Sequence, residues 1–120
     1  IIITKTKTII HTYKMENRTD GTQKYDSNRD ISQSTGFATI AQGVNTDNDQ
    51  SLNWTLHLFN PSSTTFVTHF IARTLHTAGG GSRDCYAAGY GNTTSAVDAI
   101  QFKFDSGNID AGDICLYGIL

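Results

Sequence analysis

The sequence predicts an all-β protein, an antiparallel β-sandwich of jelly-roll type with seven or eight strands. Residues that favour strands dominate the composition: Thr alone occurs 17 times in 120 residues, and Glu16 is the single glutamate. Apolar residues recur at every second position between clusters of Gly, Asn, Asp and Ser, and no window carries an apolar stripe of helical period. Short strands between frequent turns are typical of sandwiches. The length fits one domain, residues 1–120.

The first third of the chain predicts two strand regions and two polar connections. Residues 3–15 alternate and place Ile9, His11, Tyr13 and Met15 on one face. Residues 17–28 are rich in turn formers, and Asp20-Gly21 is a strong hairpin signal. A short strand is expected over residues 37–41, followed by a polar loop over residues 45–51.

The middle of the chain carries the clearest alternation. One face holds Leu52, Trp54, Leu56 and Leu58, and the other holds Asn53, Thr55 and His57, so that His57 should face solvent or a neighbouring subunit. Residues 60–63 contain the only proline and predict a turn. A long strand with apolar residues on both faces is expected over residues 65–75.

The last third predicts three more strands separated by glycine-containing turns. Residues 79–82 form a loop tip, and residues 85–90 form a strand with Tyr86 and Tyr90 on one side. Residues 100–104 form the next strand, and residues 105–108 turn the chain toward a final strand. Gly107 and Gly112 are expected at positive φ, and Gly118 is expected to permit close packing of a neighbouring strand. The residues expected to meet in the core are Trp54, Ile100, Phe102, Ile114 and Leu116.

Several motifs resemble a family of virion surface proteins of tailed bacteriophages. They are LHLFNP at 56–61, FIAR at 70–73, AIQF at 99–102, SGNI at 106–109 and GDICLYGI at 112–119, with YDS at 25–27 after Asp20-Gly21. Members of that family end in a pattern close to SGNIxxGxIxLYGI. The chain departs from the pattern at Asp110, Asp113 and Cys115.

The resemblance implies a β-sandwich of the virion surface, such as a capsid decoration or a component of a tail fibre or knob. It also implies assembly with other virion proteins and, together with the apolar residues 1–3 and 120, a homotrimer. The matching residues are structural, so the resemblance transfers a fold and a location but no active site. We therefore expect a structural protein that acts through protein–protein contacts and has no enzymatic activity or cofactor.

Two other functions are compatible with the sequence. A host-adsorption module would bind surface carbohydrate through Arg83, Tyr86 and Tyr90 near the glycine-rich loop, because aromatic and polar side chains suit sugar contacts. A secreted, glycosylated β-sandwich would use the Asn-x-Thr triplets that begin at Asn17, Asn53 and Asn92. In that case Cys85 and Cys115 could form a disulfide, whereas assembly in a reducing cytoplasm favours free thiols.

Other chemistries are disfavoured by spacing and charge. The four histidines (His11, His57, His69 and His76) do not have the spacing of zinc ligands. The oxygen-bearing side chains of Asp105, Asn108, Asp110 and Asp113, and those of residues 47–49, do not follow a calcium-loop pattern. A net charge of −2 does not indicate the basic surface that binds nucleic acid. No apolar run is long enough to span a bilayer. No motif of nucleophilic catalysis or phosphate binding is present.

Overall fold

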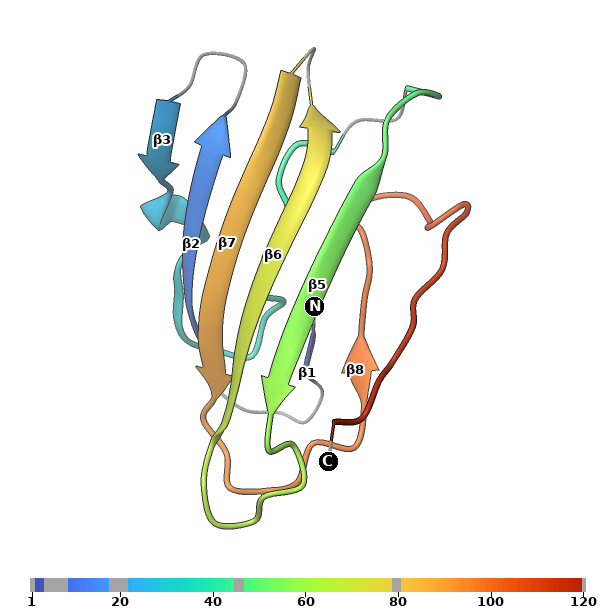
Figure 1. The fold of residues 1–120 in the computed structure, drawn as a ribbon. Coiled ribbons are helices and arrows are strands. Elements are labelled where there is room, and N and C mark those ends of the chain that lie inside the picture. Colours follow the sequence, from blue (N-terminus) through green and yellow to red (C-terminus); the bar gives the residue numbers. More distant parts are fainter. Residues whose placement is uncertain (1, 4–8, 18–21, 45–46, 79–80, 120) are drawn as a thin grey trace.

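The computed structural model describes residues 2–3, 9–17, 22–44, 47–78 and 81–119 (Figure 1). Apart from one 3-10 turn, the regular structure in these ranges is β-strand, which confirms the all-β class. The elements in chain order are β1 (Ile2–Ile3), β2 (Ile9–Asn17), β3 (Thr22–Tyr25), the turn η1 (Ser27–Arg29), β4 (Ile31–Ser34), β5 (Leu52–Phe59), β6 (Thr68–Ala78), β7 (Gly81–Gly91) and β8 (Ile100–Gln101).

One six-stranded antiparallel sheet dominates the molecule. Its strands follow the order β3-β2-β7-β6-β5 (Figure 1), and β4 pairs with β2 along the same edge as β3. A separate pair of short strands, β1 and β8, forms a two-stranded sheet. The antiparallel pairing of β2 with β3 is the hairpin that the sequence indicates, although Asp20-Gly21 itself lies outside the described residues. β5 is the strand at one edge of this sheet, because β6 is its only neighbour among the described residues, and β3 and β4 form the opposite edge.

The two faces of the large sheet differ sharply in exposure. All 11 residues of β6 alternate between buried and exposed, and the buried set begins at Thr68 and includes Phe70 and Ala72. The register places Leu56 of β5, Ala72 of β6 and Ala87 of β7 side by side on this buried face. We call it the inner face, and the opposite face is the outer face. The expected division of residues 52–58 into two faces is confirmed, with His57 exposed on the outer face.

Irregular segments cover the inner face. Residues 36–44 pass behind the sheet in Figure 1, and the Thr74 hydroxyl donates to the Ile40 carbonyl at 2.8 Å. Small side chains such as Ala72 and Ala87 line the sheet here, so the covering chain can lie directly on it. Residues 97–104 cover the part under β5, where the rings of Trp54 and Phe102 are 4.7 Å apart.

The expected strand over residues 37–41 is wrong, although this segment does belong to the core. Ala38 is 2% exposed and packs against Phe70. The segment crosses the sheet instead of joining its ladder, and a side-chain hydroxyl satisfies the Ile40 carbonyl. Alternation of apolar residues therefore indicated burial here but did not determine the pairing partner.

The expected strand near the end of the chain is also wrong. Residues 102–119 form no strand, and β8 is limited to two of the residues expected over 100–104. Leu116 is 90% exposed and Ile114 is 52% exposed, so neither side chain is buried in the core. Trp54 and Phe102, in contrast, pack against each other as expected. Gly107 and Gly112 do have positive φ, of 74° and 135°. A Cβ at Gly118 would meet nothing within 4 Å, so close packing does not require a glycine there.

Other strand boundaries also differ from expectation. The long strand begins at Thr68 and ends at Ala78, three residues later at each end than the expected 65–75. Gly81 and Ser82, expected in the loop tip over 79–82, belong to β7, and residues 79–80 lie outside the described part.

Phe70→Ala tests the contribution of the inner face to stability. Phe70 is 2% exposed, and its removal leaves a cavity beside Ala38, so we expect a loss of about 3–5 kcal/mol in the free energy of unfolding. The neighbouring Ile71→Ala is the control, because Ile71 is on the outer face and 48% exposed. Urea denaturation of both variants measures the difference, and equal losses would contradict the assignment of faces.

Candidate functional site

The outer face of β5, β6 and β7 is uncovered among the described residues. Its large apolar side chains are strongly exposed: Phe59 is 50% exposed, Ile71 48%, Leu75 47% and Tyr86 40%. Cross-strand pairing places them on one continuous surface together with several polar groups. An exposed apolar surface rimmed by polar residues commonly marks a contact site.

Arg73, Asp84 and Tyr86 form a polar cluster on this face. Arg73 Nε donates to Asp84 Oδ1 at 3.0 Å, and Nη2 donates to Oδ2 at 2.7 Å, so the ion pair is bidentate. The Tyr86 hydroxyl donates to Asp84 Oδ2 at 3.3 Å, and the guanidinium carbon of Arg73 lies 5.1 Å from the centre of the Tyr86 ring. Asp84 is 1% exposed, whereas the other two side chains remain accessible. The cluster therefore presents a fixed ring beside a cation.

A second group of rings lies toward the other end of the same face. Phe59 of β5, His69 of β6 and Tyr90 of β7 occupy directly paired positions across three strands. The rings of His69 and Tyr90 are 5.5 Å apart and tilted by 45°. His57 stacks beside Phe59 with ring centres 6.4 Å apart. These aromatic groups could contact the faces of a planar or cyclic ligand.

The structure separates the residues that the sequence grouped as a candidate carbohydrate site. Tyr86 and Tyr90 share the outer face, as expected. Arg83 occupies the opposite face, where its Nη1 donates to the Gln42 carbonyl at 3.0 Å. The cation beside Tyr86 is Arg73, which sequence reasoning missed together with Asp84. The signal that could have found Arg73 is the alternation of β6, which places it opposite Tyr86 once the two strands pair.

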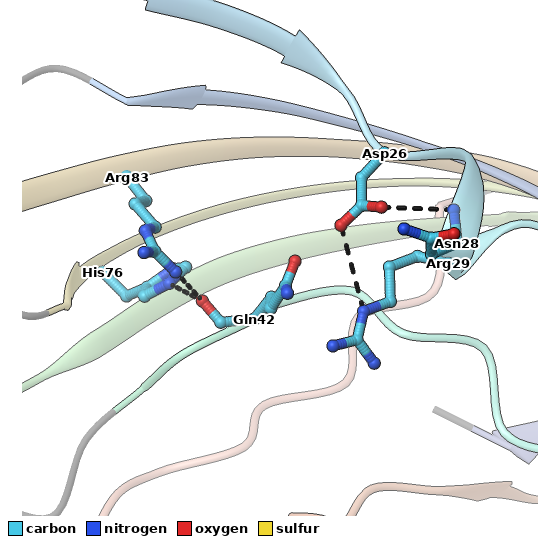
Figure 2. A network of polar contacts seen from close by, with 6 residues as sticks. All are labelled: Asp26, Asn28, Arg29, Gln42, His76 and Arg83. Carbon is cyan, nitrogen blue, oxygen red and sulfur yellow. Dashed lines mark hydrogen bonds and ion pairs between the residues drawn. The ribbon is translucent and has the colours of Figure 1, made fainter. Parts of the chain in front are cut away.

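A polar network on the inner side fixes the covering segment to the sheet (Figure 2). Asp26 Oδ1 accepts a hydrogen bond from the backbone N–H of Asn28 at 3.2 Å, and Asp26 Oδ2 is 4.0 Å from Arg29 Nε. In the orientation that satisfies both neighbours, the Gln42 side-chain amide donates to Asp26 and accepts from Arg29, each at 3.0 Å. The network therefore connects η1 with the segment over residues 36–44.

The backbone carbonyl of Gln42 is the centre of the second half of this network. It accepts from Arg83 and also from His76 Nε2, at 2.8 Å (Figure 2). Gly43 has a φ of 73°, and a Cβ there would lie 2.4 Å from an Arg83 nitrogen, so a side chain would obstruct this contact. His76 is 2% exposed, and its Nδ1 has no hydrogen-bond partner among the described residues. Burial is the main cause that lowers the pKa of His76, the Gln42 carbonyl opposes this, and the positive Arg83 lowers the pKa further.

Residues 109–119, which we call the C-terminal segment, form the second candidate contact surface. Leu116 and Ile119 are each 90% exposed, and Tyr117 is 80% exposed. In an extended strand Ile114 and Leu116 would point to one side, and Cys115, Tyr117 and Ile119 would point to the other. Such a strand has two apolar sides, a pattern typical of strands that are covered on both faces.

The remaining candidate residues do not form a site in the described part of the chain. Cys85 is buried and Cys115 is exposed, and no disulfide joins the two. No group of three His, Cys, Asp or Glu side chains is arranged to hold a metal ion in the ranges that the structure describes. No helix among the described residues has the length and apolar character needed to cross a membrane.

Comparisons with known proteins identify no relative. No family model, no curated protein and no solved structure matches the chain.

The stability of the fold should fall at mildly acidic pH because of His76. Its pKa is lower in the folded chain than the ordinary value of 6.5, so the unfolded chain binds the proton more readily. Stability is therefore full above about pH 6.5 and falls as the pH drops from there toward the folded pKa. The slope is at most about 1.4 kcal/mol per pH unit for one proton.

Urea denaturation between pH 7.5 and 5.0 measures this effect, with His76→Gln as the control. The other three histidines are unchanged in the variant, so their titration cancels in the comparison. An NMR titration of His76 measures its pKa directly without a substitution. A His76 pKa at or above 6.5, or the same pH dependence in both proteins, would contradict the assignment.

Proposed function

We propose that this protein is a structural component of the surface of a tailed-phage particle, acting through assembly with further copies and neighbouring virion proteins. The observation that carries the proposal is the exposed C-terminal segment. Residues 114–119 contain no charged residue, and four of them carry large apolar side chains that are 52–90% exposed. A soluble protein that presents such a segment gains free energy by burying it against a partner.

The sequence supports the particle surface as the location. The GDICLYGI and SGNI motifs that resemble the phage family lie within or next to the exposed segment. In this proposal three copies assemble, which is the number that the resemblance implies. The assembled domain is a jelly-roll-like sandwich whose first layer is the six-stranded sheet, and β1 and β8 contribute to its second layer.

Leu116→Asp tests assembly through residues 114–119, the last part of the C-terminal segment. We expect the unaltered protein to be oligomeric at micromolar concentration. In the variant the dissociation constant of the oligomer should rise at least tenfold, because a carboxylate replaces a side chain that the partner buries. Ile109→Asp is the matched control outside residues 114–119 and should change the constant less than threefold. Analytical ultracentrifugation measures both. A stable monomer of the unaltered protein would contradict the proposed function.

A carbohydrate-binding, host-adsorption module is the second candidate function. It is favoured by the Tyr86 ring, which is exposed and held between Arg73 and the buried Asp84. A fixed ring next to charged hydrogen-bonding groups suits a sugar, which offers an apolar face and a rim of hydroxyls.

Tyr86→Ala tests this second candidate. We expect at least a tenfold loss of binding to host surface polysaccharide, measured by glycan array and calorimetry, because the stacking surface is removed. Tyr25→Ala is the control, since Tyr25 is 56% exposed and lies on β3, two strands away from Tyr86 across Lys14 of β2. Binding that survives substitution of both Tyr86 and Tyr90 would rule out this surface.

A further inference from the structure

The free edge of β5 lacks the features that usually protect an edge strand. Residues 52–59 form eight residues of strand without a proline, a lysine or any other charged residue, apart from His57. Edge strands with this character readily accept another strand, because their outward N–H and C=O groups are unpaired. The pairing of β5 on its other side is regular from Leu52↔His76 to Phe59↔His69, so nothing bends its free edge away.

The burial of β5 indicates that a neighbour is missing at this edge. Its inner-facing side chains are only half-buried, although the corresponding side chains of β6 are fully buried. Trp54, Leu56 and Leu58 have the same inner orientation as Thr74, Ala72 and Phe70, with which they pair. The difference lies in the number of strand neighbours, which is two for β6 and one for β5 in the described sheet.

The C-terminal segment likewise lacks a strand partner among the described residues. Its residues form no strand, and no backbone hydrogen bond joins residues 102–119 to another described part of the chain. Residues 114–119 are long enough to pair along most of β5 and are apolar on both sides. In Figure 1 this segment, drawn in dark red, runs past β8 at the side of the molecule where β5 is the edge strand.

We propose, on the basis of the assembly function above, that residues 114–119 of one copy add as an antiparallel strand to the free edge of β5 in a second copy. Antiparallel pairing continues the pattern of the whole sheet. The register that sets Leu116 beside Leu56 places Ile114 beside Leu58, over the inner face. It also places Cys115 opposite His57, so that the outer face continues onto the added strand.

The exposed side chains of residues 114–119 set the apolar area that a contact between copies would bury. The exposed parts of Ile114, Leu116, Tyr117 and Ile119 amount to about 400 Å² at typical side-chain areas. Each contact between two copies buries this area on the donated strand and a similar area on the acceptor, about 800 Å² in total, which is below the roughly 1,200 Å² at which standard stable interfaces begin. Each copy takes part in two such contacts, and the main-chain hydrogen bonds of the added strand supplement the apolar burial. Donation from copy to copy is a head-to-tail contact, which closes as a ring when the rotation permits.

Cysteine cross-linking tests the strand addition with Cys115 as a native reporter. Asn53→Cys, Thr55→Cys and His57→Cys each place a thiol at an outer-face position of β5, and mild oxidation follows at micromolar concentration. Directly opposed residues have Cβ atoms close enough for a disulfide, whereas residues two positions away are too distant. We expect chains to be linked between copies most efficiently in His57→Cys, at least tenfold above Ala88→Cys, an outer-face control on the central strand β7.

Two controls make the result specific. Cys115→Ser in the His57→Cys background should abolish the linkage, and Cys85 does not compete because it is 0% exposed. An oligomer that shows no link at any of the three β5 positions would overturn the strand addition but leave the assembly function intact. A link formed within single chains would overturn it as well, and a monomeric unaltered protein would overturn both proposals.

Discussion

Residues 38–42 lie directly on the inner face of β6 and β7, and the arrangement of the whole molecule depends on this contact. Small side chains on the two strands leave room for the segment, which is tied down through its own carbonyl groups. Thr74 donates to the Ile40 carbonyl, and His76 and Arg83 both donate to the Gln42 carbonyl. Because the covering backbone is satisfied by side chains, it needs no strand partner. The central part of the sheet is therefore covered by a loop, and the outer edge of β5 has no strand partner among the described residues.

The contrast between the covered centre of the sheet and its uncovered edge at β5 bears on function. The side of the chain near β5 carries both an unpaired edge and an exposed apolar segment, and one copy satisfies neither of them. A contact between copies would satisfy both at once, and this is the physical basis of the proposed assembly. The outer face is a second surface, separate from the edge of β5. Its buried Asp84 keeps Arg73 and Tyr86 in fixed positions without using them for the core, and this leaves them available to a ligand.

The candidate site could be predicted only in part. Tyr86 and Tyr90 share a face, as their spacing of four residues in a strand requires. Arg83 was grouped with them because it is close in sequence, but its odd spacing from both places it on the inner face. Arg73 is 13 residues away from Tyr86 and becomes its neighbour only through the pairing of β6 with β7. Local sequence carries no information about a partner that a hairpin register brings into contact.

The sequence by itself determined the all-β class, the alternation of residues 52–58 and the positive φ of Gly107 and Gly112, because these depend on intrinsic propensity, two-residue periodicity and local sterics. Only the tertiary structure decided which apolar segments become strands. Residues 37–41 and 114–116 have similar apolar character, yet Ala38 is buried beneath the sheet and Leu116 is exposed. The reason is that a strand needs hydrogen-bonding partners from distant parts of the chain, or from another chain, and alternation specifies a face without specifying the partner.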